Sequence, residues 1–168
     1  MVDQERWRSL GEIVYLSGGK LVGKTRLQKT VYLLQEMGID LGYDFDYHFY
    51  GPYSEEIDDD VKWAKYFQVL KTRDEPGNHA IPYTVFEIGA TAVTHSEELR
   101  DDRTKAALST LAHHGAVVLE LAATLRYLQR NGYERNAEEE LRLRKQSKAS
   151  PERVVEAKQL LAELRITA

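Results

Sequence analysis

Residues 18–25 read Gly-Gly-Lys-Leu-Val-Gly-Lys-Thr and match the pattern G-x-x-x-x-G-K-[ST] of a phosphate-binding loop. In such a loop, the glycines let backbone N–H groups surround the phosphates of a nucleotide. Lys24 would then contact the β- and γ-phosphate oxygens, and Thr25 would bind Mg²⁺. The motif therefore offers nucleotide binding at Gly18 to Thr25 as one hypothesis.

The sequence around this motif argues against a phosphate-binding loop. Such a loop follows a buried parallel strand, which reads as a near-continuous run of Val, Ile and Leu. The apolar residues before Gly18 instead continue a helical spacing that begins at Trp7. No later predicted strand ends in an aspartate of the Walker-B type. We therefore expect the C-terminal cap of a helix followed by a basic loop, and nucleotide binding is the least favoured hypothesis.

Two other groups of residues raise the question of a metal site. Asp44, Asp46 and His48 alternate along a predicted strand and so point to one face. No His-x-x-x-His pair or second carboxylate–histidine pair accompanies them, so we interpret them as the solvated face of a sheet. The adjacent His113 and His114 point about 100° apart on a helix, which favours helix capping over chelation. The chain has no cysteine and no G-x-S-x-G pattern. The sequence thus predicts no metal, no cofactor and no catalytic residue, and we expect a protein that is not an enzyme.

Four basic residues near the start of the second predicted helix could contact phosphates, namely Lys20, Lys24, Arg26 and Lys29. The whole chain is nevertheless acidic, with 23 Lys and Arg against 27 Asp and Glu and a net charge of −4. Nucleic acid cannot be bound here through bulk positive charge. A DNA-binding regulator that uses these four residues and a wing over residues 71–82 is therefore the alternative hypothesis.

The period of the apolar residues predicts mostly helices. They are expected over residues 3–17, 24–37, 54–67, 106–113, 116–128, 136–148 and 150–164. Alternating aromatic and polar residues predict a strand over 43–49, with a turn at Gly51 and Pro52. Ser54 is the expected N-cap of the helix that follows. Residues 69–72 and 82–88 are predicted to be two strands joined by a polar loop.

The order helix, strand, helix and two-stranded hairpin in residues 24–88 resembles a winged-helix unit. The hairpin strands must be antiparallel because no helix separates them. Residues 116–128 are apolar around nearly the whole helix, which predicts a central buried helix. We therefore predict one domain over residues 1–168 of the mainly helical α+β class. A winged-helix-like part with a small antiparallel sheet (1–90) packs on a C-terminal helical bundle (91–168).

The predicted helix after Tyr53 begins with an acidic run, because five of the six residues from 55 to 60 carry carboxylates. These charges suit the positive end of a helix dipole. At the position of a recognition helix they would repel DNA phosphates. Residues 54–90 hold eight acidic and four basic side chains, so this segment alone accounts for the net charge of −4. A basic protein partner suits this segment better than DNA.

The corner formed by Tyr50, Gly51, Pro52 and Tyr53 joins the predicted strand to the acidic helix. Gly51 permits a backbone conformation that other residues resist, and Pro52 restricts the next backbone angle. The corner is interpreted either as a rigid structural turn or as an exposed aromatic recognition site, since tyrosine favours interfaces.

Three stretches of the chain resemble the YwgA-like family of uncharacterised bacterial and archaeal proteins. They are LQKTVYLL (27–34), HFYGPYSEEI (48–57) and LELAATLRYL (119–128). This resemblance spans about residues 8–165. Over about residues 10–90, the Leu-Gln-Lys helix and the Tyr-Gly-Pro-Tyr corner are more distantly similar to the Panacea (SocA-like) antitoxin domain. The first family implies no activity, and the second implies recognition of a partner protein such as a toxin.

The leading hypothesis is a non-enzymatic adaptor or antitoxin-like protein that recognises a protein partner. We expect it in the cytoplasm, because the N-terminal residues lack an apolar signal core and no apolar run reaches the roughly 20 residues of a membrane span. The residues predicted to contact the partner are Tyr50, Gly51, Pro52, Tyr53, Glu55, Glu56 and Asp59.

Overall fold

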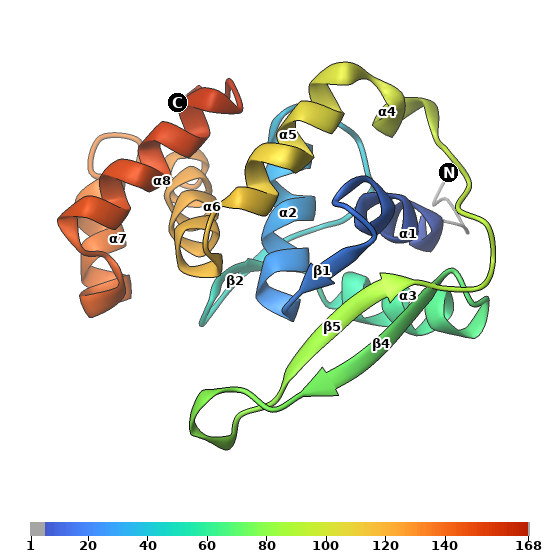
Figure 1. Ribbon diagram of the computed structural model, residues 1–168. Helices are drawn as coiled ribbons and strands as arrows, with labels where there is room; N and C mark the ends of the chain where they lie inside the picture. Colours follow the sequence, from blue (N-terminus) through green and yellow to red (C-terminus); the bar gives the residue numbers. More distant parts are fainter. Residues whose placement is uncertain (1–5, 168) are drawn as a thin grey trace.

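The computed structural model describes residues 6–167 (Figure 1). The helices are α1 (Trp7–Leu16), α2 (Lys24–Glu36), α3 (Glu55–Tyr66), α4 (Glu97–Arg100), α5 (Asp102–His113), α6 (Ala116–Arg130), α7 (Ala137–Lys145) and α8 (Pro151–Glu163), with 3-10 turns η1 (Asn78–Ala80) and η2 (Gln146–Lys148). The strands are β1 (Lys20–Val22), β2 (Asp46–His48), β3 (Gly51–Tyr53), β4 (Leu70–Glu75) and β5 (Tyr83–Ile88). The mainly helical α+β class is confirmed.

Two small antiparallel sheets accompany the helices. The larger has the strand order β1-β5-β4. In the central strand β5, Phe86 is paired with Leu21 of β1 on one side and with Thr72 of β4 on the other. The smaller pairs β2 with β3 and places Tyr47 opposite Pro52. The β4–β5 hairpin extends away from the rest of the molecule (Figure 1).

One continuous hydrophobic core joins the N-terminal and C-terminal parts. Its buried residues include Leu10 of α1, Leu33 of α2 and Leu119 of α6. Helix α6 is buried over most of its surface and packs against α2, α7 and α8, as its apolar composition predicts. Helix α6 lies between α7 and α8 on one side and α2 on the other (Figure 1).

Most predicted helices are confirmed within a few residues. The predicted first helix begins at Trp7, and residues 3–5 of that prediction lie outside the described residues. The predicted helix 106–113 begins earlier, at Asp102, where the side chain of Asp101 accepts a hydrogen bond from the Thr104 N–H at 2.5 Å. The hairpin strands are also confirmed, with β4 extending three residues further than predicted.

The predicted strand 43–49 is wrong over its first half, since only residues 46–48 form β2. The backbone of Tyr43 is instead paired by a side chain. Its N–H donates to Gln35 Oε1 at 2.9 Å, and its carbonyl accepts from Gln35 Nε2 at 2.8 Å. The buried aromatic ring of Tyr43 therefore reflects packing on helices, not membership of a sheet.

The predicted turn at Gly51 and Pro52 is also wrong. These two residues are the first two of β3, and the turn lies one step earlier, at Phe49 and Tyr50. Pro52 can occupy this short strand because it lacks only the N–H donor, and its carbonyl remains available. The chain therefore reverses at two exposed aromatic residues, and Gly51 and Pro52 lie inside the fold.

Candidate functional site

The backbone after the corner is held by the side chain of Gln28 from α2. Gln28 Nε2 donates to the Ser54 carbonyl oxygen at 2.9 Å, and the Ser54 N–H donates to Gln28 Oε1 at 3.0 Å. The hydroxyl of Ser54 does not cap α3 as predicted, and it is buried with no hydrogen-bond partner among residues 6–167. The amide of Gln28 therefore fixes the start of α3 in place of an N-cap side chain.

Lys29 holds the corner itself. Its ammonium group is buried and donates to the Pro52 carbonyl oxygen at 2.6 Å. Burial lowers the pKa of Lys29 to about 8, and the nearby Glu120 carboxylate opposes this shift. Gln28 and Lys29 of the Leu-Gln-Lys stretch thus bind neighbouring backbone groups of the Tyr-Gly-Pro-Tyr-Ser stretch.

A buried carboxylate on α6 completes this arrangement. Glu120 Oε1 lies 2.9 Å from Lys145 Nζ, and Glu120 Oε2 lies 3.0 Å from Lys148 Nζ. Lys145 also donates to the Phe49 carbonyl oxygen at 3.0 Å. The β2–β3 turn is therefore bound from α2 on one side and from α7 on the other, with Glu120 as the shared counter-charge.

Gly51 lies directly against α6. Its φ angle is +85°, and a Cβ atom added there would stand 2.3 Å from Thr124 Oγ1. A side chain at this position would therefore meet both backbone strain and a steric clash. The third stretch that carries the family resemblance, residues 119–128, thus packs against the second, and the corner joins all three.

The corner is therefore mostly interior, unlike the exposed recognition site that was the second interpretation. Gly51 and Pro52 are buried, and Tyr53 is half-buried with its hydroxyl donating to the Asp58 carboxylate. Burial and that hydrogen bond raise the pKa of Tyr53 to about 12. Tyr50 alone among the four is exposed, and its ring lies 4.7 Å from Lys148 Nζ.

The acidic run of α3 divides between an inner and an outer side. Asp60 is buried and Glu56 is half-buried, and both pair with Arg6, at 2.7 Å and 2.9 Å respectively. Glu55 and Asp59 are exposed, and Asp59 pairs with the equally exposed Lys62 at 2.7 Å. The acidic surface is consequently smaller than the predicted one, and Glu56 belongs mainly to the internal network.

Sequence reasoning missed an exposed aromatic group at the end of α3. Trp63, Tyr66 and Phe67 are 53%, 75% and 46% exposed. The Phe67 ring stacks on the buried Trp7 ring at 4.7 Å between centroids, and the Tyr66 ring meets Phe67 edge-on at 5.1 Å. We call the outward surface that combines these rings with the outer carboxylates the α3 face (Glu55, Asp59, Trp63, Tyr66 and Phe67).

The spacing of residues along α3 could have revealed this surface. Positions 55, 59, 63 and 66 are three or four residues apart and fall on one side of a helix, opposite the buried Ile57, Asp60 and Ala64.

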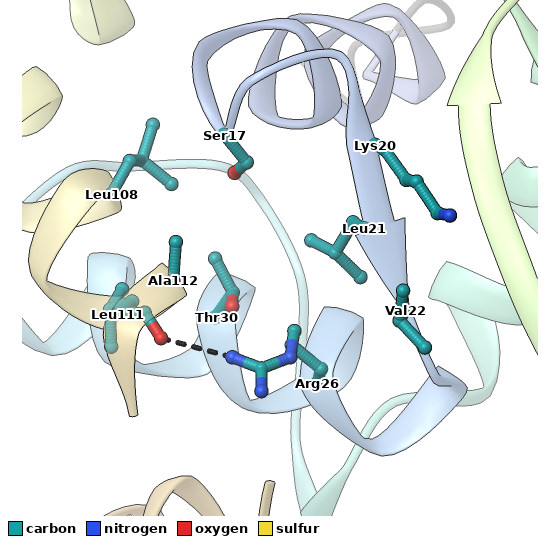
Figure 2. Close-up of a pocket in the computed structure, with 9 residues that line it drawn as sticks. All are labelled: Ser17, Lys20, Leu21, Val22, Arg26, Thr30, Leu108, Leu111 and Ala112. Atoms are coloured by element: carbon teal, nitrogen blue, oxygen red, sulfur yellow. Dashed lines mark hydrogen bonds between the residues drawn. The ribbon is translucent and has the colours of Figure 1, made fainter. Parts of the chain in front are cut away.

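The predicted basic patch does not form as one surface. Lys20 and Lys24 are exposed, but Lys29 is buried under the corner. Arg26 is half-buried, and its Nη1 donates to the Leu111 carbonyl oxygen at 3.0 Å. In Figure 2 the Lys20 ammonium points away from the Arg26 guanidinium. Helical periodicity explains the difference, because Lys29 lies on the inner side of α2.

The region of the phosphate-loop motif begins with the predicted helix cap, but the predicted basic loop is wrong. Lys20–Val22 form the edge strand β1, paired antiparallel with β5. The Gly19 N–H donates to the Val14 carbonyl oxygen at 2.9 Å, and the Gly23 N–H donates to Thr84 at 2.8 Å. These two amides are therefore occupied by protein carbonyls and do not line an open anion cradle.

The residues considered for metal binding are dispersed. Asp46 and His48 are exposed in β2, and the His48 ring packs 4.9 Å from the Tyr53 ring. Between residues 6 and 167 no group of three or more His, Asp or Glu side chains is arranged to hold a metal ion. His113 Nδ1 lies 2.6 Å from the Ser109 carbonyl oxygen at the end of α5, in keeping with the predicted capping role.

Across the described part of the chain, every helix is too short or too polar to traverse a lipid bilayer.

The geometry defines a mainly helical α+β protein in which a Leu-Gln-Lys helix and an α6 carboxylate hold a Tyr-Gly-Pro-Tyr corner. No family model matches the chain. It is similar to the protein named "Uncharacterized protein YwgA" from Bacillus subtilis (strain 168), with 26% identity over 154 residues. The match covers 90% of this chain and 92% of that protein. The predicted resemblance to the YwgA-like family is therefore confirmed.

Proposed function

We propose that the chain is a non-enzymatic protein-recognition module, an adaptor or antitoxin-like protein, and that the α3 face binds its partner. The observation that carries this proposal is the exposure of Trp63, Tyr66 and Phe67 side by side at the end of one helix. Tryptophan and tyrosine dominate the binding energy of protein interfaces. Three adjacent exposed rings are unusual on a surface that only meets water.

The rings are held in position before any partner arrives. Phe67 stacks on Trp7, which is buried in the core. Trp63 and Tyr66 each contact Phe67 with ring centroids 6.3 Å and 5.1 Å away. A side chain that is already ordered loses little conformational entropy on binding, so such anchors favour affinity.

The charge of the α3 face indicates the chemistry of the partner. Glu55 and Asp59 lie at one end of the face and the rings lie at the other. A partner with lysine or arginine next to apolar side chains would match both ends. This supports a basic protein partner, and a basic toxin is one protein of that kind.

A hollow of about 280 Å³ adjoins the aromatic end of the face. It is lined by Trp7, Arg8, Phe67, Val69, Thr91, Ala92 and Thr94. A single apolar or cationic side chain of the partner fits a space of this size, and hot-spot residues commonly fill such pockets. The hollow therefore supports the aromatic end as the centre of the interface.

Affinity capture from an extract of the source organism tests this proposal. The variants are Tyr66→Ser and the charge reversal Glu55→Lys with Asp59→Lys. Leu143→Ser is the matched control, because Leu143 is 66% exposed on α7 and lies outside the α3 face. We expect one stoichiometric partner with the unaltered chain and the control, and at least about tenfold less with each α3 variant. Equal recovery with all four chains would contradict the proposal.

The element order supports a second candidate, a winged-helix DNA-binding regulator. The order is α1, β1, α2, the β2–β3 pair, α3 and the β4–β5 hairpin, so α3 precedes the hairpin as a recognition helix precedes a wing. Lys20 and Lys24 would be its exposed phosphate contacts. A mobility-shift assay over a range of salt concentrations distinguishes the two functions, because DNA binding through phosphates weakens steeply as salt rises.

A further inference from the structure

A second pocket lies away from the α3 face, between β1, the first half of α2 and α5. Its volume is about 270 Å³. Its lining residues are Ser17, Lys20, Leu21, Val22, Arg26, Thr30, Leu108, Leu111 and Ala112. Figure 2 shows Leu21, Thr30 and the Arg26 guanidinium around the central space, with the α5 side chains closing the opposite side. The pocket thus combines aliphatic side chains with the guanidinium group of Arg26, and the ammonium group of Lys20 points away from that guanidinium.

Arg26 differs from Arg6 and Arg126, which are also half-buried. Arg6 pairs with Glu56 and Asp60, and Arg126 pairs with Glu36 at 2.6 Å. Within residues 6–167 Arg26 forms no ion pair, and its Nη1 is bonded to the Leu111 carbonyl oxygen. Burial lowers the pKa of Arg26, and no carboxylate offsets that effect. A half-buried cation with only a carbonyl partner is under-compensated, so an anion entering the pocket would be stabilised there.

The shape of the lining restricts the anion. A guanidinium binds a planar carboxylate with two parallel hydrogen bonds, which gives direction as well as affinity. The accessible apolar side chains beside that group are those of Val22 and Ala112, while Leu21, Leu108 and Leu111 are buried behind them. A bare inorganic anion would leave Val22 and Ala112 uncovered, and a pocket of about 270 Å³ lies below the usual range for ligand pockets, which favours a small ligand.

We propose that this pocket binds a small carboxylic acid with a short branched or aromatic body. The carboxylate lies on Arg26, and the body lies against the side chains of Val22 of β1 and Ala112 of α5. The site uses no residue of the α3 face, so it stands independently of the proposed protein-recognition function.

Calorimetric titration with 4-methylpentanoate and benzoate tests the proposal, with the uncharged amides of both acids and inorganic phosphate as comparison probes. We expect both acids to bind the unaltered chain. Each amide, and each acid with Arg26→Met, should bind at least about tenfold more weakly. Lys24→Met is the matched control, because Lys24 is exposed on the same helix and does not line the pocket. This control should bind the acids as the unaltered chain does.

A second variant separates loss of the site from loss of the fold. Ala112→Phe leaves Arg26 in place and fills the pocket from its exposed rim, so it should also abolish acid binding while the melting temperature stays unchanged. The proposal is overturned if acid and amide bind equally, if Arg26→Met binds as well as the unaltered chain, or if phosphate binds as tightly as the acids. It is also overturned if the unaltered chain binds neither acid at about 10 mM.

Discussion

The corner and the α3 face are consecutive in the chain but differ in almost every physical respect. At the corner, Gly51 and Pro52 are buried and two lysines bind backbone carbonyls. On the α3 face, carboxylates and aromatic rings meet solvent, and Tyr66 is 75% exposed. The corner contributes internal contacts that hold the fold together, whereas the α3 face consists of side chains exposed to solvent.

This difference shows what the recognisable motif of the chain reports. The Tyr-Gly-Pro-Tyr corner stands out in the sequence because Gly51 must accommodate a φ of +85° against Thr124, and Lys29 must reach the Pro52 carbonyl. These are demands of packing. The α3 face has no comparable motif, because any large aromatic at the right helical spacing would serve.

The largest effect on stability is expected from Glu120→Gln. This change leaves Lys145 buried without its carboxylate, and breaking a buried pair in this way costs about 3–5 kcal/mol of unfolding free energy. Glu138→Gln is the matched control, since Glu138 also contacts two cations, Arg142 and Lys158, but near the surface. It should cost less than about 1 kcal/mol. Urea denaturation measures both, and equal losses would remove the distinction between the buried and exposed clusters.

A smaller loss is expected from Gly51→Ala. The added methyl group meets Thr124 Oγ1 and the residue must keep its positive φ, so we expect a loss of about 2–4 kcal/mol. Gly18→Ala carries the strain without the clash, because φ is +97° there and no atom lies within 4 Å of the added Cβ. Its loss should be about 1 kcal/mol. Identical urea midpoints for the two variants would show that α6 does not press on the corner.

Lys29 should give the fold a distinctive pH dependence. Its pKa of about 8 lies below its ordinary value of 10.5, so the unfolded chain binds more protons between these pH values. The contribution of Lys29 to the unfolding free energy should therefore rise with pH, by about 2–3 kcal/mol between about pH 7 and about pH 10.

Urea denaturation of the unaltered chain and of Lys29→Met across this pH range isolates the contribution. The difference between the two curves should grow in favour of the unaltered chain as pH increases. Lys24→Met removes an exposed lysine of the same helix and should run parallel to the unaltered chain. Parallel curves for Lys29→Met as well would mean that Lys29 titrates normally.

The smallest effect on stability is expected on the α3 face. Tyr66→Ser and the Glu55→Lys, Asp59→Lys double variant alter exposed side chains, so each should change the unfolding free energy by less than about 0.5 kcal/mol. Thermal melting of the variants measures this. A loss of more than about 2 kcal/mol of unfolding free energy would mean that these residues stabilise the fold, as the corner residues do.

The helices could be predicted from the sequence because each long apolar period is repeated several times. Trp7, Leu10, Ile13 and Val14 are all buried on one side of α1, as their spacing predicts. Strand β1 escaped prediction because three residues cannot display a period, and its partner β5 is more than sixty residues away. The backbone of Tyr43 differs from the prediction because the side chain of Gln35, at the end of the preceding helix, supplies the hydrogen bonds that a strand partner would.

The candidate site was predicted in its segment but not in its residues. The acidic run was located correctly along the chain and the turn was predicted one step too late, and sequence alone could not tell that Glu56 pairs with Arg6 or that Lys29 lies beneath Pro52. Both contacts join residues far apart in the chain. Exposure therefore decided which of the predicted residues remain on the surface, and exposure is a property of the packed fold.

Site-specific photo-crosslinking compares the two regions most directly. A benzophenone-bearing phenylalanine replaces either Tyr66 on the α3 face or Phe49 at the corner turn, two residues of similar exposure at 75% and 84%. Each chain is irradiated in an extract of the source organism. A discrete protein adduct formed at position 66 and absent at position 49 is the predicted result. An adduct at position 49 with none at position 66 would contradict the assignment of partner binding to the α3 face.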